Sequence, residues 1–207
     1  KIKNDETQVF SEEEVKRIIE YLTAQQETSL EYQGVLFLFQ TGLRVGELSS
    51  LKPEDRVNDS LFHVSRTEIY YKDIETGKYV NTVKESPKTP TGDRYVVMTD
   101  GTKETWDRIL AMSDATEYLF ERKGKRLRSR VFYNRIIKIC DILGIPRRST
   151  HKIRKTYGTE LLNSGVDEKL VTGQMGHVDI STTKGHYYYD NKTVNRKVEI
   201  LNKAMSY

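Results

Sequence analysis

The pattern of apolar and polar positions predicts helices at both ends of the chain. Near the N-terminus, apolar residues recur at helical spacing at Val15, Ile18, Ile19 and Leu22. Ser11 and Glu14 have the spacing of a capping box at the start of this helix. A second segment, from about 30 to 41, is apolar nearly all round, which predicts a helix buried at the centre of the fold. Gly42 is expected to end it.

The middle of the chain has the composition of β-structure. Segments 61–71, 78–83 and 94–98 are rich in β-branched and aromatic residues, and Thr76-Gly77 and Thr91-Gly92 are turn signals. A short helical turn is expected at 45–50, and further helices at 100–110, 129–143, 150–162, 168–175, 181–188 and 193–204. We expect Asp100 or Thr102 to cap the first of these helices and Ser129 the second. The order predicts an α+β domain, mostly α, with a small antiparallel β-sheet.

Size and composition exclude several classes of protein. A chain of 207 residues can form one core, or one core with a smaller lobe. No apolar run approaches the roughly 20 residues that span a bilayer, so we expect no membrane segment. The single cysteine, Cys140, allows no internal disulfide and fits a reducing, cytoplasmic location. The chain does not begin with methionine, so we interpret it as part of a longer protein.

Charge adds a hint of the partner. The net charge is only +4, but cations cluster at Arg122, Lys123, Lys125, Arg126, Arg128 and Arg130, and again at Arg147, Arg148, Lys152, Arg154 and Lys155. Such clusters suit a polyanion. A solvated charged face is the plainer interpretation of a single run.

Four short patterns are candidates for chemistry. They are Arg44 within Thr-Gly-Leu-Arg-Val-Gly-Glu-Leu, Lys88 in a predicted hairpin over 87–97, His151 with Arg154, and Gly176-His177 followed by three consecutive tyrosines at 187–189. His151 and Arg154 share a helix face, which makes sense if both point at an anion. Taken one at a time, each pattern has an ordinary alternative, namely a surface arginine, a loop lysine, a capping histidine and packing aromatics.

Taken together, the patterns resemble the signature of the tyrosine recombinase (phage integrase) family. Arg44, Lys88, His151, Arg154, His177 and Tyr187 stand in the family's order from residue 41 to 187. The details are most similar to integrases of phages and conjugative transposons. The resemblance implies a catalytic domain over 1–190 and the absence from this chain of an N-terminal core-binding domain. It also implies a helical tail over 191–207 that packs in trans on a neighbouring subunit; packing on its own domain is an equal alternative.

The resemblance also implies a reaction. Tyr187, or Tyr188 as the alternative, would attack a DNA phosphate to give a 3′-phosphotyrosine, which a second strand then resolves during integration or excision of a mobile element. Arg44 and Arg154 would clamp the phosphate with His177, His151 would accept the tyrosine's proton, and Lys88 would protonate the leaving oxygen. We expect Glu47 to orient an arginine. No metal or cofactor is implied, and the sequence has no Asp/Glu or Cys/His cluster with metal-ligand spacing.

The implied partners are double-stranded DNA and further copies of the chain in a tetramer on DNA, with an accessory DNA-bending protein as a further candidate. Three alternatives stay open. One is a type IB topoisomerase-like enzyme that nicks and reseals one strand. Another is a catalytically inactive DNA-binding relative. The third is a basic α+β domain that binds RNA or protein.

Overall fold

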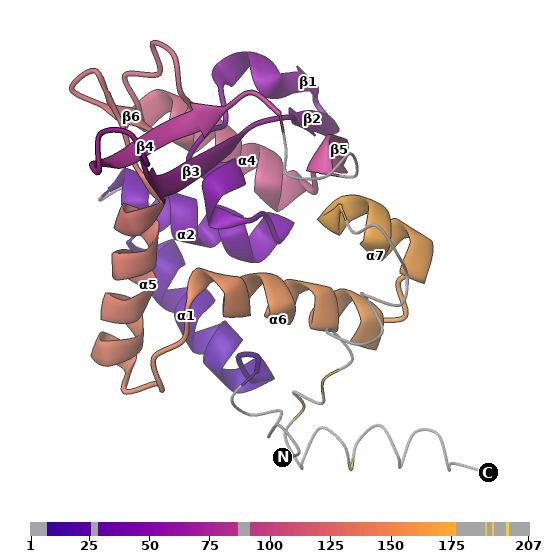
Figure 1. Cartoon of the computed structure of the whole chain (residues 1–207). Helices are drawn as coiled ribbons and strands as arrows, with labels where there is room; N and C mark the ends of the chain where they lie inside the picture. The colour runs from indigo at the N-terminus through magenta and orange to yellow at the C-terminus, as the bar shows by residue number, and fades with distance from the viewer. Residues whose placement is uncertain are drawn as a thin grey trace.

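A computed structural model describes residues 8–25, 29–86, 92–176, 189, 192 and 198. Its α-helices are α1 (Glu12–Ala24), α2 (Leu30–Thr41), α3 (Val45–Leu48), α4 (Asp100–Met112), α5 (Ser129–Leu143), α6 (Thr150–Asn163) and α7 (Glu168–Met175), with a 3₁₀ turn η2 (Pro53–Asp55). Its strands are β1 (Arg56–Asn58), β2 (Leu61–Val64), β3 (Thr67–Lys72), β4 (Tyr79–Lys84), β5 (Arg94–Val97), β6 (Glu121–Arg122) and β7 (Lys125–Arg126). The predicted α+β, mostly helical class is confirmed (Figure 1).

Helix α1 starts where its local sequence requires. The Ser11 amide donates to the Glu14 carboxylate at 2.8 Å, and the Glu14 amide donates to the Ser11 hydroxyl at 3.2 Å. This reciprocal pair is the predicted capping box. Ile18 and Leu22 of the same helix are buried against the core.

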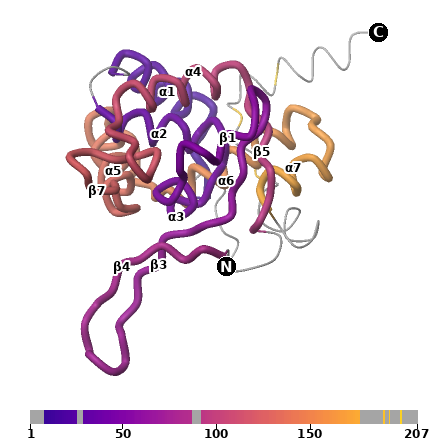
Figure 2. The backbone as a smooth tube through the Cα atoms, turned by 90° about the horizontal axis from the view of Figure 1, so that it is seen from above, coloured from indigo at the N-terminus to yellow at the C-terminus, as the bar shows by residue number. Residues whose placement is uncertain are grey.

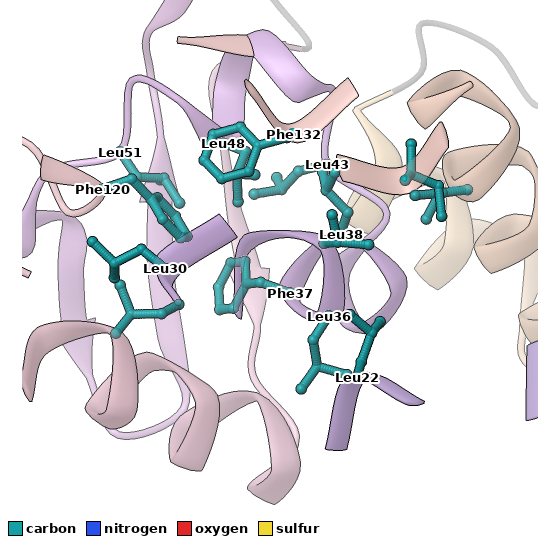
Figure 3. Packing of buried hydrophobic residues seen from close by; sticks show 14 of the residues in the cluster. Leu22, Leu30, Leu36, Phe37, Leu38, Leu43, Leu48, Leu51, Phe120 and Phe132 are labelled. Carbon is teal, nitrogen blue, oxygen red and sulfur yellow. The ribbon is translucent and has the colours of Figure 1, made fainter. Parts of the chain in front are cut away.

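Helix α2 is the central element, as its apolar composition predicts. It packs against α1, α4, α5 and α6, and Figure 3 shows Leu36, Phe37 and Leu38 among the side chains that fill the core around it. A Cβ on Gly34 would lie 2.2 Å from Cε1 of Phe132, so only glycine lets α5 approach this closely. Gly42 ends the helix in the left-handed region with φ of 63°, which confirms the predicted stop.

The three-stranded sheet has the order β1-β2-β5 and is antiparallel. Phe62 of β2 lies opposite Val96 of β5, and both side chains are fully buried. The Phe62 ring packs 5.4 Å from that of Trp106 on α4. The sheet is thereby fixed to the helical core through one of its faces.

The predicted continuous strand over 61–71 is wrong. It divides into β2 and β3, which lie in separate sheets. At the break, the Arg66 guanidinium hydrogen-bonds the carboxylate of the buried residue Asp55. Strand β3 pairs with β4 instead, and Figure 2 shows this hairpin extending away from the helical body.

The predicted hairpin around Lys88 is also wrong. Strands β4 and β5 flank this segment in sequence, but β4 pairs with β3 and β5 pairs with β2. The segment is therefore a connection between two sheets. Lys88 itself lies outside the described residues.

Smaller differences concern turns and caps. Thr99 caps α4 by accepting a hydrogen bond from the Thr102 amide at 3.3 Å, in place of the predicted Asp100 or Thr102. The α5 cap is Arg128, one residue before the predicted Ser129. The β6–β7 pair was not predicted, and it turns through Lys123 and Gly124, both with positive φ.

Two remaining predictions concern the C-terminal part and membranes. The helices expected at 181–188 and 193–204 lie outside the described residues, apart from the helical residue Val198. Among the described helices, none combines the length and apolarity needed to cross a bilayer.

Candidate active site

Arg44 lies where the chain passes from the central helix into α3. The left-handed Gly42 turns the chain, and Arg44 then occupies the N-cap position of α3 in an extended conformation. Its guanidinium Nη1 donates to the Glu47 Oε1 at 2.7 Å, and its amide donates to Oε2 at 2.9 Å. The Arg44 side chain is 44% exposed, so a ligand can reach it from outside.

Glu47 is a buried charge shared by two arginines. Its side chain is 3% exposed and contacts Arg44 on one side and Arg94 of β5 on the other. Burial alone would raise the pKa of Glu47, but the charges of Arg94, Arg154 and Arg44, with the hydrogen bond from Arg94, lower that pKa to about 2. Glu47 is therefore a carboxylate at neutral pH, and it orients Arg44 as the sequence predicts.

Helix α6 carries the next two candidates. Arg154 is buried, and its Nη1 donates to the Gly42 carbonyl at 2.6 Å while its Nη2 donates to the Met175 carbonyl. These bonds join α6 to the start of the Arg44 segment and to the C-terminus of α7. A cation suits the unpaired carbonyls at a helix C-terminus.

His151 lies one turn before Arg154 on α6 and is exposed. Partial desolvation lowers its pKa, and the nearby charges of Lys155, Arg154, Lys152 and Arg44 lower it further. The imidazole is therefore neutral at pH 7 and is able to accept a proton. The charges of Arg44 and Arg154 lower the pKa of His151 and also that of Glu47. The predicted residues Arg44, Arg154 and His151 therefore lie near one another.

The other three predicted residues, Lys88, His177 and Tyr187, lie outside the described residues. Described residues that lie close in sequence to Lys88 and to His177 contact Arg94 and Arg154. The Gly92 carbonyl, four residues after Lys88, accepts from Arg94 Nη1 at 3.1 Å. The carbonyls of Gln174 and Met175, just before Gly176-His177, accept from Arg94 and Arg154.

Two residues of this cluster were missed by sequence reasoning. Arg94 is one of them, although the alternation along the strand was a signal for it. Arg94 and Val96 lie on the buried face of β5, and Tyr95 between them lies on the exposed face. Lys155 is the other; it was counted only as part of a basic run, yet it is buried. Its Nζ donates to the Tyr189 hydroxyl at 2.9 Å and lies 5.1 Å above the centre of that ring. No local signal could have found this contact.

Cations and one neutral imidazole therefore dominate the chemistry of this cluster. In the described part of the chain, no group of three or more His, Cys, Asp or Glu side chains is placed to hold a metal ion. An arrangement of oriented guanidinium groups beside a proton acceptor suits an oxyanion such as a phosphate.

Comparison with known proteins identifies a family for the chain. The family model described as the phage integrase family matches residues 8–193. The transposase of transposon Tn916 from Enterococcus faecalis is 26% identical over 196 residues, covering 86% of this chain and 47% of the transposase. A XerC-like tyrosine recombinase from Caldanaerobacter subterraneus is 29% identical, covering 95% of this chain and 54% of the relative. The chain thus spans about half the length of these curated relatives.

Solved structures support the fold. The Tn1549 transposon integrase in complex with transposon right end DNA has a TM-score of 0.71 at 18% identity, covering 96% of this chain and 66% of that one. The XerA recombinase has a TM-score of 0.68 at 24% identity, covering 95% of this chain and 64% of that one. These likenesses show a shared fold. Because the family model covers most of the sequence, the chain belongs to the phage integrase family.

Proposed function

We propose that this chain is the catalytic part of a site-specific DNA recombinase that cuts and rejoins DNA through a 3′-phosphotyrosyl intermediate. The observation that carries the proposal is the approach of Arg44 and Arg154, from two distant segments: Arg154 donates to the Gly42 carbonyl, two residues before Arg44, and the charges of both arginines lower the pKa values of Glu47 and His151. Relatives named as transposases and tyrosine recombinases support the same reaction for this chain.

The arginines supply the electrostatic part of the mechanism. Attack on a phosphodiester puts additional negative charge on the non-bridging oxygens, and preorganised donors stabilise that charge. The half-exposed Arg44 is the direct contact, and Glu47 holds its fork in place. Arg154 is fixed by two main-chain carbonyls and adds a second positive charge from the buried side. Each such donor typically contributes about 10²–10³ in rate.

Proton transfer involves the remaining residues. A tyrosine with a pKa of about 10 is a weak nucleophile until a base takes its proton. Desolvation and the neighbouring cations both lower the pKa of His151, which is the proposed base. The family signature gives Tyr187 as the nucleophile, Lys88 as the acid for the leaving 5′-oxygen and His177 as a further donor to the phosphate. One ester replaces another of similar energy, so the proposed exchange requires no ATP.

A basic groove along α5 is the proposed path of the DNA backbone. It is lined by Arg130, Tyr133, Lys138, Arg147 and Ser149, together with Asn134, Ile137 and Asp141. Ser149 is the N-cap of α6, so the groove reaches the end of the helix on which His151 lies. Cations in such a groove would contact phosphates and fix the register of the duplex.

We further propose that several copies of the chain, a tetramer in the family's manner, assemble on DNA, with an accessory DNA-bending protein as a further partner. The tail 191–207 is the proposed link between copies. Val198 is helical and 49% exposed, as expected of a residue that a neighbouring subunit covers. Deleting 191–207 should weaken assembly of several copies on one DNA more than binding of a single copy in a mobility-shift titration. Equal losses would contradict docking in trans.

The reaction itself is tested with a nicked suicide duplex that carries a site selected from random-sequence DNA by binding of this chain. The nick lets the short 5′-hydroxyl fragment diffuse away, so the covalent protein–DNA adduct accumulates. We expect an adduct that resists denaturing electrophoresis and is lost in Tyr187→Phe. Loss in Tyr188→Phe alone would move the nucleophile by one residue. Binding without any adduct would contradict the proposal and favour a binding-only protein.

A further inference from the structure

Arg94 makes an unusual set of contacts for a residue in a small sheet. Its side chain is only 6% exposed. The guanidinium donates to both oxygens of Glu47, at 3.2 and 2.9 Å, and Nη1 also donates to the Gly92 carbonyl at 3.1 Å. Nε donates to the Gln174 carbonyl at 2.9 Å. One planar group therefore joins α3, the start of β5 and the C-terminus of α7.

Each of these three contacts is made to a residue that either binds, or lies close in sequence to, a residue with a proposed role in the reaction. Glu47 holds Arg44 directly. Gly92 follows Lys88 by four residues, and Gln174 precedes His177 by three. We propose that Arg94 is a positioning residue for DNA cleavage, which fixes α3 with its Arg44, the start of β5 and the C-terminus of α7 relative to one another. This inference rests on the proposed recombinase function and deepens it.

The core alone gives no reason for an arginine here. Arg94 shares the inward face of β5 with Val96, which packs in the apolar core, so an aliphatic residue would continue that pattern. A buried cation is tolerated only with close partners and satisfied hydrogen bonds. The fork geometry of arginine meets a carboxylate with two parallel bonds, and lysine has no equivalent arrangement.

Helix α7 is held on the edge of β5 by a second residue. The Gln174 side chain accepts from the Val97 amide at 3.0 Å and donates to the Val97 carbonyl at 3.4 Å. With the Arg94 bond to the Gln174 carbonyl, the helix is fixed to the strand at two adjacent points. The start of β5 and the end of α7 are therefore joined by hydrogen bonds from two side chains, Arg94 and Gln174.

The test separates positioning from general stability by comparing two arginine-to-lysine variants. Arg94→Lys keeps the charge and loses the fork. Arg66→Lys is the matched control, because Arg66 is also largely buried and pairs with the buried Asp55, and its hydrogen bonds go to Ser65 and Asp55 instead of to α3, β5 or α7. For each variant we would measure the thermal midpoint, the affinity for the selected duplex, and the single-turnover rate of adduct formation on its nicked form.

We expect Arg94→Lys to lower the cleavage rate about 10- to 100-fold, since small misplacements of reacting groups have effects of this size. DNA affinity should stay within about twofold, because phosphate contacts dominate it. Arg66→Lys should lower the thermal midpoint about as much as Arg94→Lys does, but it should keep the wild-type cleavage rate. A cleavage rate within threefold of wild type in Arg94→Lys, or an equal loss in both variants, would overturn the proposal.

If Arg94→Lys does not fold, the double variant Glu47→Gln with Arg94→Gln leaves this pair without an unmatched buried charge. Because Glu47 also holds Arg44, the comparison is with Glu47→Gln alone. We expect the double variant to bind DNA and to cleave at least about tenfold more slowly than Glu47→Gln. Cleavage at the rate of Glu47→Gln would overturn the proposal. Wild-type protein that forms no adduct would refute the recombinase function itself, whereas a fast Arg94 variant would refute only the role of Arg94.

Discussion

At the scale of single residues, the site depends on one buried carboxylate. Glu47 accepts from the amide and guanidinium of Arg44 and from both terminal nitrogens of Arg94. Without this charge Arg94 and Arg44 would repel each other, and a buried carboxylate without the arginines would take up a proton. The orientation of the half-exposed Arg44 thus follows from a charge that is itself buried.

This charge gives a stability prediction with a defined pH window. The pKa of Glu47 is about 2 in the folded chain, below the ordinary value of 4.5, so its contribution to stability is complete above pH 4.5. It is lost as the pH falls from 4.5 toward 2. At pH 7 we expect Glu47→Gln to lower the free energy of unfolding by about 3 kcal/mol. Urea titrations at pH 7 and at pH 3 test this, and a deficit that does not shrink at the lower pH would count against the ionised pair.

His151 gives a second prediction, on rate. Its pKa is lowered by desolvation and by neighbouring cations, of which Lys155 acts most strongly. A neutral base works above its pKa, so cleavage should be constant near pH 7 and fall only in more acidic solution. Lys155→Met should raise the pKa of His151 and move the acidic limb of the pH–rate profile to higher pH. Lys152→Met, the control, should move it less because its charge acts more weakly. An acidic limb that stays in place in Lys155→Met would contradict His151 as the base.

At the scale of elements, the close contact between α2 and α6 sets the distance between Arg44 and Arg154. Gly42 ends α2, and its carbonyl accepts from Arg154 of α6. A Cβ at this position would lie 2.2 Å from Cδ1 of Tyr157, also on α6, and φ is 63°. Glycine is therefore required here both by the backbone and by the neighbouring ring.

Two helix-ending glycines offer a matched test of this contact. Gly144 ends α5 with nearly the same φ, 62°, but nothing lies within 4 Å of a Cβ placed there. Gly144→Ala should lower the free energy of unfolding by about 1–2 kcal/mol for the left-handed backbone alone. Gly42→Ala should lower it by about 1–3 kcal/mol more, because Tyr157 must move, and it should also slow cleavage. An equal loss of unfolding free energy in the two variants, measured by denaturant titration, would mean that Tyr157 moves aside without destabilising the α2–α6 contact.

The β3–β4 hairpin is a second element tied to the site, through its base. The Glu68 carboxylate accepts from Arg126 at 2.5 Å, from Asn81 at 2.7 Å and from the Ser129 amide at 3.0 Å. A Cβ on Gly46 of α3 would lie 2.7 Å from the Thr67 hydroxyl. The hairpin therefore rests directly on the short helix that follows Arg44, although its far end extends away from the body (Figure 2).

At the scale of the whole molecule, the candidate site assembles from four elements in three distant parts of the sequence. Helix α3, strand β5, helix α6 and the end of α7 are joined by the hydrogen bonds of Arg94 and Arg154. Each arginine joins the 42–47 segment to the end of α7. The candidate active site is thus held together by the hydrogen bonds of these two arginines.

Sequence reasoning reached the parts of this arrangement that depend on local patterns. The capping box of α1, the buried α2 and the Gly42 stop need only neighbouring residues, and all three were predicted correctly. The pairing of β2 with β5 links residues thirty or more positions apart, and no turn signal indicates it. Arg94 was missed for the same reason, since its value comes from Glu47 and Gln174, which only the folded chain brings near it.

The most direct test of the central claim is to identify the bond between protein and DNA. The adduct from the nicked duplex would be digested with trypsin and nuclease, and the nucleotide-bearing peptide sequenced by mass spectrometry. We expect a nucleotide joined through its 3′-phosphate to Tyr187, with a free 5′-hydroxyl on the released fragment. A 5′-phosphate linkage, or a modified residue outside the tyrosines at 187–189, would contradict it.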